Sequence, residues 1–405
     1  MDSDSDSDHR PVDDSTRKKS RRPPNTAFRQ QRLKAWQPIL TPKTVLPLFL
    51  CITVIFAPIG GLLLYASNQV QELVIDYSHC QDEGSTEDWN EIPSKYISQS
   101  FKGGAKPDYN PTWKLLKDSD RDNYTCSLQF EIPTDMGAPV FMFYRLTNFY
   151  QNHRRYVQSF NEDQLNGKDV EASKLKEDCK PLYKDDDTGK PIYPCGLIAN
   201  SLFNDTFHSP VLLNAQSSSS SNETYKMTDK GIAWSTDKDR FKKTKYKPDE
   251  VVPPPNWHEK FPRGYTEDNM PDISEWEALQ NWMRTAGLPK FSKLALRNDD
   301  DDLKSGRYTV DIGLNFPVLK YDGTKSIVLT TRTVIGGKNP FLGIAYLVVA
   351  GLCFVLGIVF LIKHLIKPRK LGDHSYLSWN TEPQQPQQGM ATGRESAAAG
   401  AQRRF

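Results

Sequence analysis

The stretch VLPLFLCITVIFAPIGGLLLYA, Val45–Ala66, contains 22 residues and no charged side chain. A second stretch of the same kind, FLGIAYLVVAGLCFVLGIVFLI, runs over Phe341–Ile362. A helix needs about 20 consecutive apolar residues to cross the hydrocarbon core of a bilayer. The core helix of a soluble protein is shorter and less uniformly apolar, and a cleaved signal peptide starts nearer the N-terminus with a shorter apolar core. We therefore predict two retained transmembrane helices, over residues 45–66 and 341–362.

The charges that flank the first span predict its orientation. Four basic residues lie within the 20 positions before it, namely Arg29, Arg32, Lys34 and Lys43, and no Lys or Arg follows until Lys95. Because basic residues are retained on the cytoplasmic side, the N-terminus is expected to be cytoplasmic. A second span returns the C-terminus to the same side, and the intervening residues 67–340 become a lumenal or extracellular domain.

Charge is distributed unevenly along the 405 residues. Residues 1–44 hold ten basic and six acidic side chains, residues 363–405 hold seven and three, and the rest is net acidic. Basic segments beside apolar spans fit the anionic cytoplasmic leaflet, so we expect membrane lipids as neighbours and no nucleic acid as a partner. We predict a mostly disordered basic tail over 1–44, with a juxtamembrane amphipathic segment at Asn25–Pro42, and a disordered tail over 363–405.

The exterior domain is predicted to be rich in β-structure. Apolar residues alternate in Tyr124–Ile132, as in a strand with one buried face, and Ala138–Leu146 is a continuous apolar run typical of a strand covered on both faces. Tyr308–Phe316 alternates as well. The Asp-Gly pair at 322–323 then predicts a hairpin turn, with Ser326–Val334 as the partner strand.

Two other segments of the exterior domain carry local signals. The sequence DISEWEALQNWMRTAGLP, residues 272–289, predicts a helix that begins with a capping box at Asp272 and Glu275 and ends near Gly287. The sequence VVPPPNW, residues 251–257, predicts extended polyproline on the surface.

Six cysteines divide between the two environments. Cys51 and Cys353 lie in the apolar spans and are expected to be reduced. The even number in the exterior domain predicts two disulfides, and these cysteines are Cys80, Cys126, Cys179 and Cys195. Three connectivities are possible, of which we favour Cys80–Cys126 with Cys179–Cys195.

Three Asn-x-Ser/Thr sequons occur, at Asn123, Asn204 and Asn222, all in the predicted exterior domain. A single sequon is a weak signal, but three in this segment and none in the tails favour N-glycosylation. We expect N-linked glycans as a modification.

The sequence contains no recognisable catalytic motif. There is no phosphate-binding loop, no GxSxG and no HExxH, and the acidic run NDDDDL lacks the glycine and terminal glutamate of an EF-hand loop. We therefore expect no enzyme activity, no cofactor and no metal in this chain.

Small residues in the two apolar spans favour close helix packing. Such residues let helices approach within a bilayer, although glycine is also common in membrane helices in general. The candidate docking positions are Pro58, Gly60, Gly61, Gly343 and Gly351.

Several long blocks resemble a known family. They are NTAFRQQRLKAWQPILTPKTVLP, FAPIGGLLLYAS, CGLIANSLFNDTF, GIAWSTD and IGGKNPFLGIAYLVVAG. Together they resemble the cell-division-control-protein-fifty (Lem-three) family, and most closely its fungal members, from about residue 25 to about residue 370. These proteins are the non-catalytic beta subunits of type IV P-type ATPases, the phospholipid flippases.

The resemblance implies two spans, cytoplasmic termini and a glycosylated exterior domain with a β-sandwich-like core. It also implies the pairing of Cys80 with Cys126 and of Cys179 with Cys195. It further implies a one-to-one heterodimer with the ATPase. The ATPase is expected to need this subunit to leave the endoplasmic reticulum for the Golgi, endosomes or plasma membrane. It is also expected to need the subunit to translocate phospholipid. The alternatives are a subunit of a two-span ligand-gated channel and a membrane-anchored lumenal enzyme.

Overall fold

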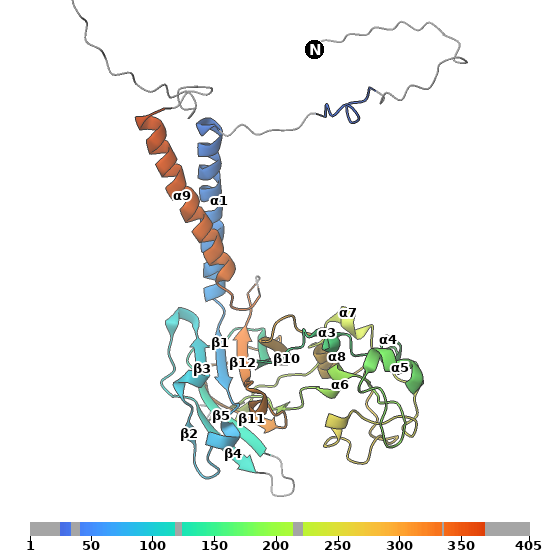
Figure 1. Cartoon of the computed structure of the whole chain (residues 1–405). Helices are drawn as coiled ribbons and strands as arrows, with labels where there is room; N and C mark the ends of the chain where they lie inside the picture. Colours follow the sequence, from blue (N-terminus) through green and yellow to red (C-terminus); the bar gives the residue numbers. More distant parts are fainter. Residues whose placement is uncertain (1–24, 34–40, 118–123, 214–221, 334–335, 369–405) are drawn as a thin grey trace, which may run out of the picture. The chain divides into compact units, whose positions relative to one another are not determined.

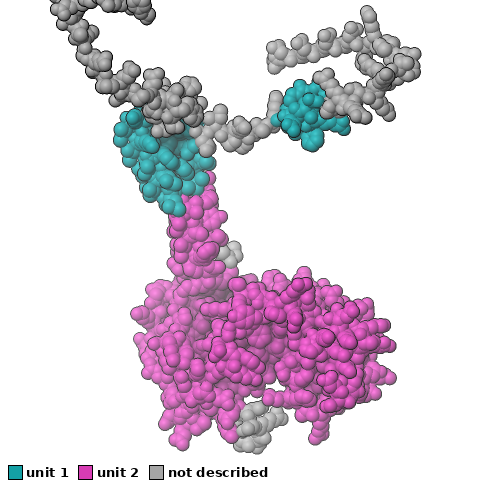
Figure 2. Space-filling model, viewed as in Figure 1, with its two compact units in different colours: residues 1–54, 351–405 teal, residues 55–350 magenta. Residues whose placement is uncertain are grey.

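The computed structural model describes residues 25–33, 41–117, 124–213, 222–333 and 336–368. The chain divides into two compact units, which Figure 2 colours differently. One comprises residues 1–54 and 351–405, and the other comprises residues 55–350.

Two long helices contain the apolar spans. They are α1 (Pro42–Asn68) and α9 (Phe341–Ile366), labelled in Figure 1. Both are long and apolar enough to cross a membrane. Most of their large apolar side chains are exposed; Leu62, for example, is 68% exposed and Phe341 is 74% exposed. A soluble protein rarely exposes apolar surface of this extent, so lipid or another protein is expected to cover it.

The rest of the larger unit is built on two antiparallel sheets. The first contains, in spatial order, β10 (Phe291–Asn298), β6 (Val140–Leu146), β12 (Lys325–Thr331), β1 (Glu72–Asp76) and β3 (Ile97–Ser100). The second contains β2 (Asn90–Glu91), β4 (Thr112–Lys117), β5 (Tyr124–Ile132), β11 (Gly306–Leu314), β8 (Val211–Leu212) and β9 (Glu223–Thr224), with β7 (Thr206–Phe207) also paired to β11.

The main hydrophobic core lies between the two sheets. Along β5, the side chains of Cys126, Leu128, Phe130 and Ile132 alternate inward and are at most 2% exposed. They pack in one cluster with residues of the facing sheet such as Ile327. The sheets therefore form a sandwich, and the predicted class of two membrane helices with a large β-rich, disulfide-bonded domain is confirmed.

The predicted hairpin between residues 308–316 and 326–334 is wrong. β11 pairs with β5, β7 and β8 in the second sheet, whereas β12 pairs with β6 and β1 in the first. The Asp322–Gly323 turn is present, with Asp322 at φ 53°, but the chain crosses between sheets there. Every residue of β12 is buried, as expected for a central strand with neighbours on both edges.

The first sheet also positions the helices. β1 begins three residues after α1 and pairs with β12, which precedes α9; the register runs from Glu72 opposite Thr330 to Asp76 opposite Ser326. Figure 1 shows β1 and β12 side by side. The segments that lead out of and into the membrane helices are thus neighbouring strands.

Short helices and loops between residues 147 and 290 carry smaller cores. The helices are α3 (Arg154–Val157), α4 (Glu162–Leu165), α5 (Ala172–Cys179), α6 (Leu197–Asn200), α7 (Ser235–Lys238) and α8 (Glu277–Met283), while α2 (Cys80–Glu83) lies earlier, after β1. Aromatic side chains dominate the packing, with Trp257 against Trp276 at 5.2 Å between ring centroids.

Two local predictions in this region are only partly right. The helix expected over residues 272–289 is present but shortened to α8, because the Asp272 carboxylate accepts hydrogen bonds from Ser274 N and Oγ and closes a turn before it. The proline-rich segment 251–257 is only partly on the surface: Pro255 and Asn256 are exposed, whereas Val251 and Trp257 are at most 5% exposed and belong to an aromatic core.

The juxtamembrane segment is described only in part. Residues 26–31 form a turn in which Thr26 Oγ1 accepts the Arg29 N–H at 3.3 Å. Phe28 is 77% exposed. The described part is therefore a capped turn, and the rest of the predicted amphipathic segment, residues 34–40 with Trp36, lies outside the described residues, as do the terminal segments 1–24 and 369–405.

Candidate functional site

Within the larger unit, α1 and α9 pack closely at two glycines. A Cβ atom added to Gly60 would lie 2.9 Å from Leu347 Cγ and 3.0 Å from the Gly343 carbonyl oxygen. A Cβ atom added to Gly343 would lie 2.8 Å from Leu64 Cγ. The two carbon–carbon distances are shorter than real Cβ contacts, so a side chain at either position would require its neighbours to shift.

Two further contacts fix the same end of the helix pair. The Phe56 and Tyr346 rings pack with centroids 4.9 Å apart. The Asn339 N–H donates to Ser67 Oγ at 3.1 Å, which ties the segment just before α9 to the last turn of α1. Within the smaller unit, the helices stack Phe49 on Phe360 at 5.9 Å.

The remaining small residues take no part in this contact. A Cβ atom added to Gly61 or Gly351 would meet nothing within 4 Å, and Pro58 is exposed. The candidate docking residues therefore form two groups: Gly60 and Gly343 join the helices to each other, while Pro58, Gly61 and Gly351 leave open surface. The sequence pattern alone did not separate these groups.

The exterior cysteines form two disulfides. Cys80 is bonded to Cys126 with a Cα–Cα distance of 6.1 Å, and Cys179 to Cys195 with 5.6 Å. These are the pairs that we favoured from the sequence, and both distances are normal for disulfides. The first joins α2 to β5 within the main core, and the second lies in a small separate cluster with Leu175. Cys51 and Cys353 are free.

Two of the three sequons lie in the described part of the chain. Asn204 is exposed between α6 and β7, and Asn222 is exposed just before β9. Asn123 lies outside the described residues. Both described acceptors are accessible to a glycosylating enzyme in the folded domain, and their modification stays a prediction.

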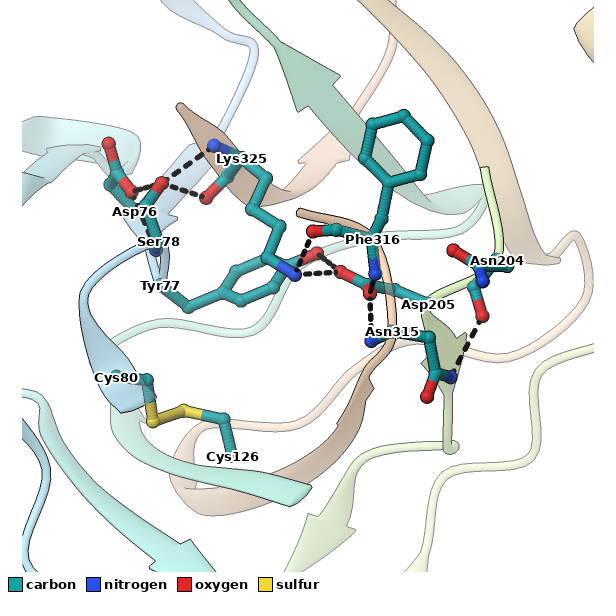
Figure 3. Close-up of polar contacts among 10 residues, drawn as sticks. All are labelled: Asp76, Tyr77, Ser78, Cys80, Cys126, Asn204, Asp205, Asn315, Phe316 and Lys325. Carbon is teal, nitrogen blue, oxygen red and sulfur yellow. Dashed lines mark hydrogen bonds and ion pairs between the residues drawn. A yellow bond between two sulfur atoms is a disulfide. The ribbon is translucent and has the colours of Figure 1, made fainter. Parts of the chain in front are cut away.

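A buried ion pair lies directly beneath the Asn204 sequon (Figure 3). Asp205, the middle residue of the sequon, pairs with Lys325 of β12 at 2.8 Å, and their side chains are 0% and 6% exposed. The same carboxylate accepts the N–H groups of Asn315 and Phe316, each at 2.7 Å, and the Tyr77 hydroxyl at 3.0 Å. Four donors thus satisfy one buried carboxylate, as a buried charge requires.

The surroundings of this carboxylate keep its donors in place. Burial, and next the negative charge of Asp205, raise the pKa of the Tyr77 hydroxyl well above its ordinary value, so it remains a proton donor. Lys325 Nζ also donates to the Phe316 carbonyl oxygen at 2.8 Å. The pair therefore joins β12, the end of β1 and the segment after β11 to the loop that carries Asn204.

Sequence reasoning did not identify this ion pair. Lys325 is 120 positions from Asp205 and directly precedes the predicted strand Ser326–Val334. One signal in the sequence was available. Asp205 lies between Phe203 and Phe207, two aromatic residues that indicate partial burial of this loop.

The acidic run at 299–302 is held by partners within the same domain. Asp299 accepts from Arg297 Nη2 at 2.5 Å, and Asp302 accepts the Ala138 N–H at 2.9 Å. Among the residues that the structure describes, no group of three or more His, Cys, Asp or Glu side chains could hold a metal ion.

The chain was compared with known proteins. Residues 63–370 match the profile of the LEM3 (ligand-effect modulator 3) family / CDC50 family. The chain is 48% identical over 363 residues to "Phospholipid-transporting ATPase accessory subunit CRF1" of Saccharomyces cerevisiae, covering 89% of this chain and 90% of the relative.

Two other relatives are similar over comparable lengths. "Phospholipid-transporting ATPase accessory subunit CDC50" of Chaetomium thermophilum is 45% identical, over 90% of this chain and 92% of its own. "Cell cycle control protein 50A" of Mus musculus is 39% identical, over 85% and 89%. None of the three is named as a channel or as a lumenal enzyme. The resemblance found in the sequence blocks is confirmed, and the chain belongs to the CDC50/LEM3 family.

Proposed function

We propose that this chain is the non-catalytic accessory subunit, and the chaperone, of a phospholipid-flipping type IV P-type ATPase. The observation that carries the proposal is that some small residues of the two helices pack against the other helix whereas others are open. The chain uses Gly60 and Gly343 for its own helix contact and leaves Pro58, Gly61 and Gly351 open. Relatives with nearly full-length similarity are named as accessory subunits of phospholipid-transporting ATPases.

The open helix surface fits a polytopic membrane partner. Helices associate in lipid mainly through close packing and polar contacts, and small residues allow backbones to approach. In the proposed one-to-one heterodimer, the ATPase packs on the exposed face of α1 and α9. The exterior domain contacts its exoplasmic loops, and the basic segment before α1 lies against its cytoplasmic side.

The proposed topology has both termini in the cytosol and residues 67–340 outside it. The basic residues before the first span and the sequons at Asn204 and Asn222 support it. In this arrangement the chain travels with its ATPase from the endoplasmic reticulum to the Golgi, endosomes or plasma membrane.

The chemistry of the complex belongs to the partner in this proposal. ATP hydrolysis, the phosphorylated aspartate and the lipid path are supplied by the ATPase, and this chain binds neither a cofactor nor a metal. Because it binds the folded ATPase and not the unfolded one, it stabilises the ATPase by mass action.

Purification of the tagged full-length chain in mild detergent tests the proposal. Mass spectrometry should recover one large P-type ATPase in equal amount. Liposomes that carry fluorescent phosphatidylserine or phosphatidylcholine should show ATP-dependent lipid movement only when that ATPase is also present. Lipid movement by this chain alone, or normal ATPase export in cells that lack every member of the family, would contradict the proposal.

A further inference from the structure

A groove of about 610 Å³ opens beside the glycosylation sequon in the larger unit. This volume is within the range of roughly 300–1,000 Å³ that is usual for small-ligand sites. Its walls come from four segments that are distant in sequence: residues 148–156, 200–204, 255–259 and 315–321. Asn204 itself is one of the lining residues.

The groove presents the Asn204 side chain from a rigid rim. The Asn204 carbonyl oxygen accepts Asn315 Nδ2 at 3.0 Å, and the next residue is anchored through the buried Asp205 carboxylate (Figure 3). The Asn204 side chain is exposed, and its amide makes no hydrogen bond within the described parts of the chain. A glycan attached to this amide would start inside the mouth of the groove.

Exposed aromatic rings line the groove. Tyr150 is 56% exposed and Tyr321 is 62% exposed. Lys320 Nζ lies 4.9 Å from the centroid of the Tyr321 ring, whereas the Tyr150 ring packs on no aromatic ring or cation of the described residues. Asn148 Nδ2 donates to the Tyr321 carbonyl oxygen at 2.9 Å and holds that rim in place. Such rings combine an apolar face with a polar hydroxyl group.

Other lining residues supply polar groups. Asn200 Oδ1 accepts the Asn256 N–H at 2.9 Å, which joins two of the four segments. His258 and Glu259 also line the groove and are exposed. A sugar ring carries an apolar C–H face and a rim of hydroxyl and amide groups, so a lining of aromatic rings and polar side chains matches its chemistry.

We propose that the groove binds the first sugars, an N-acetylhexosamine core, of the chain's own N-glycan at Asn204. The proposal rests on the exoplasmic placement of the domain in the proposed function. The bound sugars contact all four wall segments and connect them across the surface. The glycan thereby acts as a structural element of the domain and not only as a solvated modification.

Site-resolved deglycosylation of the full-length chain, purified from a eukaryotic host without its ATPase, tests this. An endoglycosidase that cleaves between the two core sugars is added, and mass spectrometry follows cleavage at Asn204 and at Asn222. Asn222 is the internal reference, because it is exposed and does not line the groove. Denatured protein shows the intrinsic rate at each site.

In the native protein, the glycan at Asn204 should be cleaved about ten-fold more slowly than the one at Asn222, with similar rates after denaturation. Tyr150→Ala should accelerate cleavage at Asn204 about five-fold, the factor expected for loss of one aromatic contact, and leave Asn222 unchanged. Tyr321→Ala provides a second groove variant. Trp234→Ala, at a 63% exposed aromatic residue outside the groove, should change neither rate.

Equal native rates at the two sites, an unmodified Asn204, or no acceleration in either groove variant would overturn the proposal. A groove variant that reduces ATPase recovery without changing cleavage at Asn204 would also overturn it, in favour of a partner loop in the groove. If the unaltered chain recovers no ATPase but shows the cleavage ratio, the subunit proposal fails and the glycan proposal stands.

Discussion

Asp205→Asn should destabilise the exterior domain severely while leaving the glycosylation sequon intact. The substitution retains Asn204 and Thr206, so the acceptor sequence is unchanged. It removes the charge that faces Lys325 at 2.8 Å, at a site where the two side chains are 0% and 6% exposed. The Lys325 ammonium then stays buried without a counter-charge.

The magnitude follows from this burial. Removal of one partner of a buried ion pair costs about 3–5 kcal/mol. A domain of ordinary stability has about 5–15 kcal/mol in total, so the variant should lose a large fraction of its stability. Asp205→Ala should be worse, because the N–H groups of Asn315 and Phe316, each 2.7 Å from the carboxylate, also lose their acceptor.

Urea unfolding of the full-length chain in mild detergent, followed by tryptophan fluorescence, measures the effect. The fluorescence reports on this domain because Trp113 and Trp282 are buried in it. The matched control is Asp163→Asn. The Asp163–Lys168 pair has nearly the same length, 2.7 Å, but its side chains are 58% and 61% exposed, so its loss should cost at most about 1 kcal/mol.

A double variant separates the charge from the packing. Asp205→Asn combined with Lys325→Met removes both charges and should recover part of the lost stability, since the buried unpaired ammonium is gone. Equal urea midpoints for Asp205→Asn and for the unaltered protein would refute the reasoning. So would a double variant that is less stable than either single one.

The other predictions concern the helix contact, a buried lysine and the disulfides. Gly60→Leu should disturb the packing of α1 on α9, because its Cβ atom would already lie 2.9 Å from another side chain. Gly61→Leu should leave that packing intact and weaken the co-purification of the ATPase. Cross-linking of the two helices measures the packing, and equal effects of the two variants on cross-linking would contradict the prediction. Burial lowers the pKa of Lys293 to about 8, below its unfolded value of about 10.4. The unfolded state therefore binds more protons between these pH values, and the free energy of unfolding should rise with pH in that window; Lys293→Met should lack the rise in urea titrations from pH 7 to 10. Replacement of Cys80 and Cys126 by serine should lower the free energy of unfolding by about 2–5 kcal/mol. It should also lower the urea midpoint more than replacement of Cys179 and Cys195, because only the Cys80–Cys126 disulfide lies in the main core.

The features predicted well from the sequence are those that depend on local patterns. The apolar spans are contained in α1 and α9, and strand β5 has the bounds Tyr124–Ile132 that its alternation indicated. In such a strand, one face is buried and the other is not, so the period of two is visible in the sequence.

The features that were missed depend on contacts between distant segments. A turn at Asp322 predicts a change of direction, but it does not specify whether the next strand pairs with the previous one or enters another sheet. The burial of Val251 and Trp257 results from aromatic residues elsewhere in the chain, which outweigh the surface preference of a proline-rich segment. The Asp205–Lys325 pair likewise exists only after β12 is placed beside β1.

The candidate site was anticipated in its members but not in their arrangement. The sequence marked five small residues in the spans as possible docking positions, and it could not divide them into packed and open positions. That division depends on the rotation of each helix about its axis, which only the packed pair defines through Gly60 and Gly343.

The short link between α1 and the first sheet has a mechanical consequence. Only residues 69–71 separate α1 from β1, so a displacement of this helix along its axis is transmitted to a strand held on both edges, by β3 and β12. A slip of one residue in this ladder would turn every inward side chain outward. The longer segment before α9 is fastened to Ser67 through Asn339. The end of α1 in the larger unit is therefore tied directly to the sheet, and the start of α9 is tied to that end of α1.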